Sequence, residues 1–121
     1  MTVSELYEKI GGNYEEAVGR LMNDDLIITF IGRFVGSNFM ERLETAFERG
    51  SSGEIFEAAH AFKGVASNLA LTKISGCVEK ITDATRPQKE DKTIDIKKEL
   101  NMLKEYYIKA ENEINNFLKQ Q

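Results

Sequence analysis

The chain contains one histidine, His60, and its neighbours are suited to chemistry at an imidazole ring. The neutral ring carries a nucleophilic nitrogen, and histidine changes charge near neutral pH. Lys63 lies one helical turn further on, so its ammonium group would share a face with the imidazole. A cation in that place could meet a phosphoryl group carried on His60 or hold an incoming anion. The pair predicts a nucleophilic side chain with a stabilising charge beside it.

The residues around His60 have the periodicity of an amphipathic helix from about residue 52 to residue 69. At about 100° per residue, the apolar side chains fall on one side and His60 falls almost opposite them. The apolar side comprises Ile55, Ala58, Ala59, Phe62, Val65, Ala66 and Leu69. Because a helix of this kind buries its apolar stripe, we expect the imidazole to point to solvent or to a partner.

Four further residues share the predicted open face with His60, namely Phe56, Glu57, Gly64 and Ser67. A glycine inside a helix costs about 1 kcal/mol relative to alanine, so we interpret Gly64 as clearance for another protein's active site. Ser67 is also small and extends that clearance. Glu57 could orient the imidazole or could simply be exposed. Phe56 could offer an apolar contact to a partner or fold back onto the preceding segment.

The composition predicts one domain over residues 1–121, long enough to bury a core without disulfides. The net charge of −4 and the absence of a dense basic patch argue against nucleic-acid binding. The single cysteine, Cys77, fits a reducing compartment and lies near the apolar side of its segment, where packing is expected. One histidine and one cysteine cannot assemble the usual metal-ligand sets, so no metal site is expected.

Targeting and membrane signals are absent from the pattern of residues. The N-terminus has no basic flank leading into an apolar run, and no apolar run approaches the length needed to cross a bilayer. We therefore expect a soluble cytoplasmic protein with no membrane partner. Nucleophile triads and glycine-rich phosphate loops are also missing, so the chain is not expected to take phosphate from ATP by itself.

Start and stop signals divide the chain into helices. Capping residues at Thr2 and Asn13 predict two short helices that end at about Gly11 and Met22. A single long helix is then predicted over residues 26–47. Its apolar residues cover more of the circumference than a core-facing stripe needs. Either this helix is central to a bundle, or part of its surface is a docking site.

Two glycines lie within that long segment, and a third follows it. Gly32 and Gly36 lie four residues apart within an apolar stretch, which usually means close helix packing. Gly50 closes the segment, and Ser51 with Glu54 then predicts a capping box that opens the His60 helix.

Two further helices are predicted over residues 72–85 and 94–119, with a solvated loop of alternating charges over residues 86–92. The last helix has apolar residues at steps of four and three, a spacing typical of a bundle seam. They are Ile96, Leu100, Leu103, Tyr107, Ala110, Ile114 and Phe117. A homodimeric coiled coil is the alternative. The predicted fold class is all-α: an up-and-down four-helix bundle with one or two short extra N-terminal helices.

The run Ala59-His60-Ala61-Phe62-Lys63-Gly64 resembles the signature of the histidine-containing phosphotransfer (HPt) domains of bacterial two-component phosphorelays. In that family an alanine-histidine pair is followed by any residue, a large apolar residue and lysine-glycine. Phe62 stands where leucine is commoner, and Ala70 stands where the family usually has glycine, near the end of the helix. Residues 6–14 also resemble the opening of small stand-alone bacterial members.

The resemblance implies that His60 accepts a phosphoryl group from the aspartyl phosphate of a receiver domain and passes it to another receiver. Lys63 would stabilise the phosphoryl oxygens, and Gly64 would permit close docking. The implied partners are response-regulator receiver domains, a hybrid sensor histidine kinase, or both. The resemblance further implies a monomer without a cofactor of its own, not an enzyme in its own right, since magnesium and the remaining catalytic groups belong to the receiver.

Two other functions are compatible with the same residues. The first is the histidine-bearing domain of a chemotaxis-type kinase, which is phosphorylated in trans by a separate ATP-binding domain. The second is a helical adaptor that never carries phosphate, and the retained His60, Lys63 and Gly64 argue against it.

Overall fold

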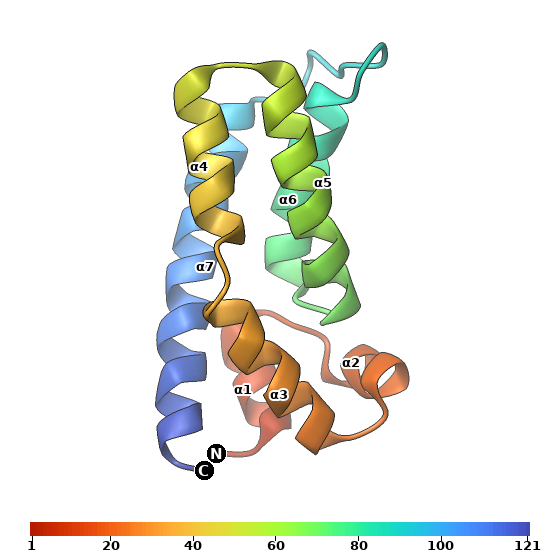
Figure 1. Ribbon diagram of the computed structural model, residues 1–121. Helices are drawn as coiled ribbons and strands as arrows, with labels where there is room; N and C mark the ends of the chain where they lie inside the picture. Colours follow the sequence, from red (N-terminus) through yellow and green to blue (C-terminus); the bar gives the residue numbers. More distant parts are fainter.

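The computed structural model describes all 121 residues of the chain. It contains seven helices and no strand, so the prediction of an all-α fold is confirmed (Figure 1). The helices are α1 (Val3–Ile10), α2 (Tyr14–Leu21), α3 (Asp24–Val35), α4 (Phe39–Arg49), α5 (Ser52–Asn68), α6 (Thr72–Thr85) and α7 (Ile96–Lys119).

The four helices α4 to α7 form the bundle, and the three N-terminal helices α1 to α3 lie at one end of it (Figure 1). Helix α5 packs against both α4 and α6, and α6 packs against α7. Helix α7 is the longest and continues past the bundle, where it contacts α1 and α3. Both chain termini lie at that end (Figure 1).

The prediction of one helix over residues 26–47 is wrong, because α3 and α4 are separate helices joined by residues 36–38. Gly36 caps the end of α3, and glycine is a poor residue for continuing a helix. The hydroxyl of Ser37 donates a hydrogen bond to the carbonyl oxygen of Phe34 at 2.5 Å. That hydroxyl takes up a carbonyl which a continued helix would use for its own backbone, so the chain turns here.

Of the two glycines predicted to mark close helix packing, one lies against another helix. Gly32 lies where α3 packs on α7: a Cβ atom there would lie 3.6 Å from the side chain of Leu118, which is an ordinary van der Waals contact. Gly36 has only the backbone of its own helix end nearby and acts as the cap.

Side chains satisfy the first backbone N–H groups of most helices, as the sequence predicts. At α1 the capping box is complete: Thr2 Oγ1 accepts from the Glu5 N–H at 3.1 Å, and the Glu5 carboxylate accepts from the Thr2 N–H at 2.9 Å. These bonds lower the pKa of the Glu5 carboxyl. At α5 the box is half complete. Ser51 Oγ accepts from the Glu54 N–H at 3.3 Å, but the Glu54 carboxylate pairs with Arg49.

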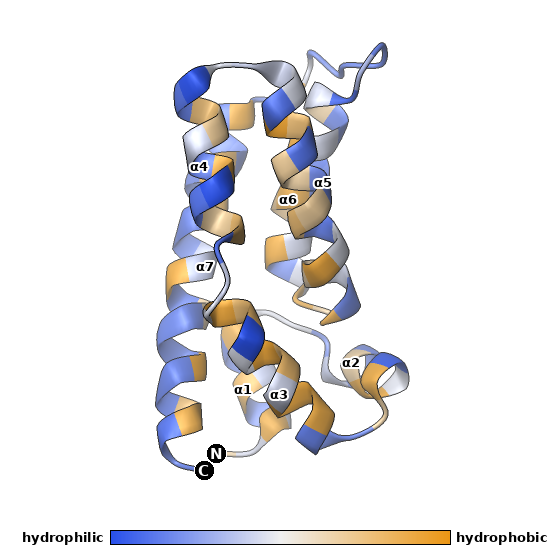
Figure 2. Ribbon diagram, viewed as in Figure 1, coloured by the Kyte–Doolittle hydropathy of each residue, from blue (hydrophilic) through white to orange (hydrophobic).

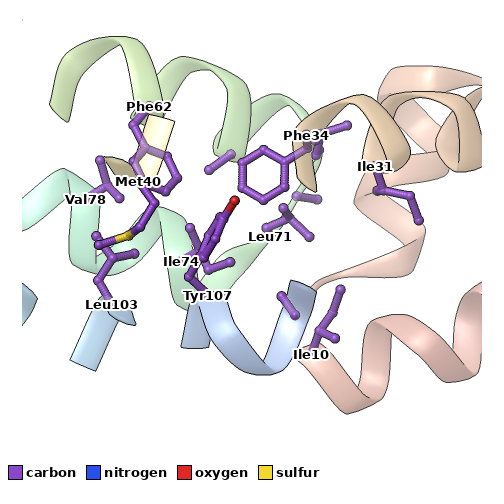
Figure 3. Close-up of a cluster of buried hydrophobic side chains, with 14 of the residues drawn as sticks. Ile10, Ile31, Phe34, Met40, Phe62, Leu71, Ile74, Val78, Leu103 and Tyr107 are labelled. Atoms are coloured by element: carbon purple, nitrogen blue, oxygen red, sulfur yellow. The ribbon is translucent and has the colours of Figure 1, made fainter. Parts of the chain in front are cut away.

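A continuous core of 29 buried hydrophobic residues runs from α1 to α7. Hydrophobic and hydrophilic residues alternate around each helix, and the loop between α6 and α7 is largely hydrophilic (Figure 2). Side chains from α3, α4, α5, α6 and α7 meet in the interior, with the rings of Phe34, Phe62 and Tyr107 side by side (Figure 3).

The seam predicted for the last helix lies against the rest of the molecule. Five of its residues are buried and two are half-buried: Leu103, Tyr107, Ala110, Ile114 and Phe117, then Ile96 and Leu100. This helix packs within its own chain, as a bundle seam should. None of the seven helices combines the length and hydrophobicity that crossing a membrane requires.

Candidate functional site

An aromatic cluster fixes the rotation of α5 about its axis. The ring of Phe62 lies 6.0 Å from that of Phe34 and 6.2 Å from that of Tyr107, and 5.9 Å from that of Phe39 (centroid distances). Aromatic pairs at these separations add to the stability that burial itself provides. Since Phe62 is two residues from His60, anchoring this ring in the core turns the imidazole outward.

His60 is exposed, as the helical periodicity predicts, and no hydrogen bond or ion pair within the chain engages its ring. Lys63 follows one turn later on α5, is half-buried, and forms no ion pair. Its ammonium group is therefore available to a ligand on the same face. The two side chains provide a free nucleophile and a free cation one turn apart.

Gly64 opens the surface beside the imidazole. It is exposed, and a Cβ atom built there would meet nothing within 4 Å. No neighbouring helix requires a glycine at this position, and the surface here is open. Ser67, one turn further, is half-buried and small, so this face of the helix carries no bulky side chain there either.

A groove of about 450 Å³ adjoins Gly64 between α3, α4 and α5. Its apolar lining comes from all three helices: Phe30, Phe34, Phe39, Val65 and Leu69. Arg33 and Asn68 supply the polar part of the lining, and the Arg33 guanidinium lies 5.4 Å from the centre of the Phe30 ring. This groove uses part of the surplus apolar surface noted in the segment before the His60 helix.

Phe56 contacts the imidazole directly. Its ring lies 5.5 Å from the His60 ring, and the two planes are 13° from parallel. The guanidinium carbon of Arg86 lies 5.6 Å from the centre of the Phe56 ring. The prediction of a fully solvated loop is therefore wrong at its first residue, because Arg86 is half-buried against Phe56. Charge patterning gave no signal for this contact, since the partners lie on different helices.

Glu57 is exposed and makes no hydrogen bond to His60. It lines a separate depression of about 330 Å³ between α4 and α5, together with Arg42 and Arg49. Of the two interpretations of Glu57, the structure shows the exposed one.

The end of the histidine helix is held by residues far away in the sequence. The Tyr7 hydroxyl donates to the Leu69 carbonyl oxygen at 2.8 Å, and the Asn13 N–H donates to the Ala70 carbonyl oxygen at 2.9 Å. Ala70 has φ +54°, a left-handed conformation that glycine adopts with less strain. This conformation explains physically why glycine suits the position.

Metal-ligating groups do not gather anywhere on the chain: no cluster of three or more His, Cys, Asp or Glu side chains could hold an ion. Cys77 is buried, as predicted, and burial together with the nearby Glu99 charge raises the pKa of its thiol to about 11. A buried thiol that keeps its proton at neutral pH is a poor nucleophile.

Comparison with known proteins identifies the family. The family model described as the Hpt domain matches residues 36–111, a stretch that begins at the break between α3 and α4 and includes His60, Lys63 and Gly64. No curated protein and no solved structure matches the chain. The matched stretch is more than half of the chain and contains an exposed histidine on a helical bundle. The chain thus belongs to the Hpt domain family and takes part in histidine phosphotransfer in a phosphorelay.

Proposed function

We propose that His60 shuttles a phosphoryl group between the aspartates of two receiver domains. The observation that carries the proposal is the free imidazole itself: exposed, without any hydrogen bond within the chain, and next to a glycine with open space around it. A second protein can therefore reach the ring without moving any element of the bundle.

In the transfer step α5 supplies the nucleophile and a cation, and the receiver supplies the remaining groups. A nitrogen of His60 attacks the phosphorus of the aspartyl phosphate, and a P–N bond forms. The bond between phosphorus and the carboxylate oxygen breaks, and its electron pair leaves with the aspartate. The reverse reaction runs through the same positions with a second receiver. Magnesium would be held by the receiver, where it would offset the negative charge of the phosphoryl oxygens.

Lys63 would stabilise the phosphoryl group on the bundle side of the junction. Its ammonium is one turn from His60 and has no carboxylate partner within the chain, so it can bind phosphoryl oxygens without first breaking an ion pair. A point charge on a flexible stem can follow the phosphoryl group as it moves between the two acceptors.

The groove beside Gly64 would receive the apolar part of the receiver's docking surface. Phe30, Phe39 and Val65 line it, and Arg33 adds a positive charge at its polar part. We expect an interface of modest area here, which would fit a transient relay.

The direct test is incubation with a receiver domain that has been phosphorylated beforehand. We expect the chain to gain a label that is lost in acid and stable in base, as a phosphorylated imidazole should be. Since the chain has a single histidine, His60→Gln should abolish this label while the helical content stays unchanged. An equal label on His60→Gln would disprove the assignment.

A second receiver added to the purified, labelled protein tests the shuttle. We expect the label to move onto the second receiver and become labile in base, as an aspartyl phosphate is. Label that enters the protein but never leaves it would contradict the relay while retaining His60 as an acceptor.

A further inference from the structure

We propose that Phe56 is a positioning residue for His60: its ring holds the imidazole in one orientation for transfer, and Arg86 holds the Phe56 ring in turn. This inference rests on the proposed function. It concerns a contact within the chain, however, and part of its test is independent of any receiver.

The His60 ring has only one restraint in the structure. Catalytic histidines are commonly oriented by a hydrogen bond to the second ring nitrogen, from a carboxylate or a carbonyl group. His60 has no such partner, and the nearest candidate in sequence, Glu57, does not bond to it. The nearly parallel Phe56 ring, 5.5 Å away, is the group that restricts rotation of the imidazole.

Restricting that rotation favours transfer because the attacking nitrogen must lie in line with the bond that breaks. An exposed, unrestrained side chain would lose rotamer freedom each time it met a receiver. A ring already stacked in one orientation has lost that freedom in advance, which lowers the barrier to an oriented attack.

The stack also suits the change of charge during transfer. When a neutral imidazole forms the P–N bond, the ring gains a positive charge, and the aspartate leaves as a carboxylate. The face of an aromatic ring attracts a cation. Phe56 would therefore stabilise the phosphorylated ring more than the neutral ring.

Arg86 explains why the Phe56 ring itself is fixed. The guanidinium lies 5.6 Å from the ring centre and pairs with Asp83 at 3.2 Å. Arg86 is half-buried where α6 ends, beside the first turns of α5. Arg86 at the end of α6 thus supports the Phe56 side chain on α5, and Phe56 supports the imidazole of His60.

A matched control is present on α7. Tyr106 on α7 is a half-buried aromatic residue with its own cation, since the Lys73 ammonium lies 5.4 Å from its ring centre. Tyr106 does not contact His60. Tyr106→Leu therefore removes a comparable ring and a comparable cation contact without touching the site.

The first measurement is proton NMR of the His60 ring in the free protein. The ring current of Phe56 acts on a ring stacked beside it, so Phe56→Leu should shift the His60 ring-proton signals, and Arg86→Ala should shift them part of the way in the same direction. Phe56→Trp should not bring them to the Phe56→Leu position, and Tyr106→Leu should leave them in place. Unchanged signals in Phe56→Leu would show that no stack exists in solution and would overturn the proposal.

The second measurement is the rate of transfer from a phosphorylated receiver at saturating concentration. Phe56→Leu should slow it roughly three- to tenfold, the range expected from the worth of one aromatic pair. Phe56→Trp should restore the rate, and Tyr106→Leu should match the wild type. Labelling by phosphoramidate, in which ammonia leaves as the P–N bond to His60 forms, should slow less than transfer from a receiver, because it shares the change of charge on the ring but not the receiver geometry.

These outcomes separate the two proposals. A wild-type protein that no receiver labels would disprove the proposed function and, with it, the role of Phe56 in transfer. A labelled wild type with an equal rate in Phe56→Leu would disprove only the positioning role. An equal loss of rate in Tyr106→Leu would assign the effect to general destabilisation and would also overturn that role.

Discussion

The hydroxyl of Tyr7 donates a hydrogen bond to the carbonyl oxygen of Leu69 at 2.8 Å, and both groups are buried. This bond joins the first helix of the chain to the residue that caps the histidine helix. Tyr7 lies outside residues 36–111, the stretch that the Hpt domain model matches. The short N-terminal helices therefore support the site from beyond the part of the chain that defines the family.

Tyr7→Phe should destabilise the protein by about 1–2 kcal/mol, because it leaves a buried carbonyl without a donor. Urea unfolding followed by circular dichroism measures the effect as a lower midpoint with an unchanged slope. Tyr14→Phe is the matched control: the Tyr14 hydroxyl also bonds to an oxygen, that of Asp24 at 2.6 Å, but at the exposed surface. Its loss should cost less than about 0.5 kcal/mol. Equal losses in the two variants would contradict a special role for the bond to Leu69.

Lys63→Ala should slow phosphoryl transfer about tenfold, which corresponds to about 1.4 kcal/mol for one charge-assisted hydrogen bond. The free energy of unfolding should hardly change, since Lys63 has no ion-pair partner in the chain. The rate is measured by incubating the protein with a phosphorylated receiver, quenching samples at successive times and quantifying the label on the protein. Lys109→Ala on α7, an exposed lysine that also lacks an ion-pair partner, should transfer at the wild-type rate. A wild-type rate in Lys63→Ala would remove the lysine from the mechanism.

Substituting Gly64 should separate stability from docking. Gly64→Gln should stabilise the helix by up to about 1 kcal/mol, because glycine is a poor helix former and a Cβ atom at this position would meet nothing within 4 Å. The same side chain should weaken receiver binding at least tenfold by occupying the clearance beside His60. Titration calorimetry and thermal unfolding measure the two effects. Gly76 on α6 is also exposed and free of neighbours within 4 Å, so Gly76→Gln should stabilise the protein and bind normally. Normal binding by Gly64→Gln would refute the clearance reading.

Cys77 should make stability depend on pH in the alkaline range. Burial raises the pKa of its thiol from the ordinary value of 9.0 to about 11. The folded state therefore retains a proton that the unfolded state loses. This contribution to stability is fully present below about pH 9 and is lost as the pH rises toward about 11. Urea unfolding between pH 8 and pH 11 should show the decline in the wild type and a smaller one in Cys77→Ala. Parallel declines would show that other groups cause it.

The position of His60 could be predicted from the sequence because one strong rule decides it. The apolar residues of α5 recur at helical spacing, and burial of that stripe leaves the imidazole outside. The first residues of α1, α2 and α5 and the last residues of α1 and α6 could be predicted for a similar reason, since capping side chains, glycine and proline act on their immediate neighbours.

The break between α3 and α4 could not be predicted from periodicity, because apolar residues continue at helical spacing on both sides of it. It depends on Gly36 and Ser37 acting together, and each is tolerated singly within a helix. The stack of Arg86, Phe56 and His60 was missed for a different reason. Phe56 and Arg86 belong to different helices, and only the packing of α5 on α6 brings them together.

The length of α7 has a consequence for how the chain can be divided. Its first half completes the bundle, and its second half supplies Ile114 and Phe117 to the interior beneath α1 and α3. Cutting the chain at residue 111, where the family match ends, would remove the part of α7 on which α1 and α3 pack and expose their buried surfaces. Helix α7 thus belongs both to the four-helix bundle and to the packing of α1 and α3. Removing either part would expose apolar surface on the other.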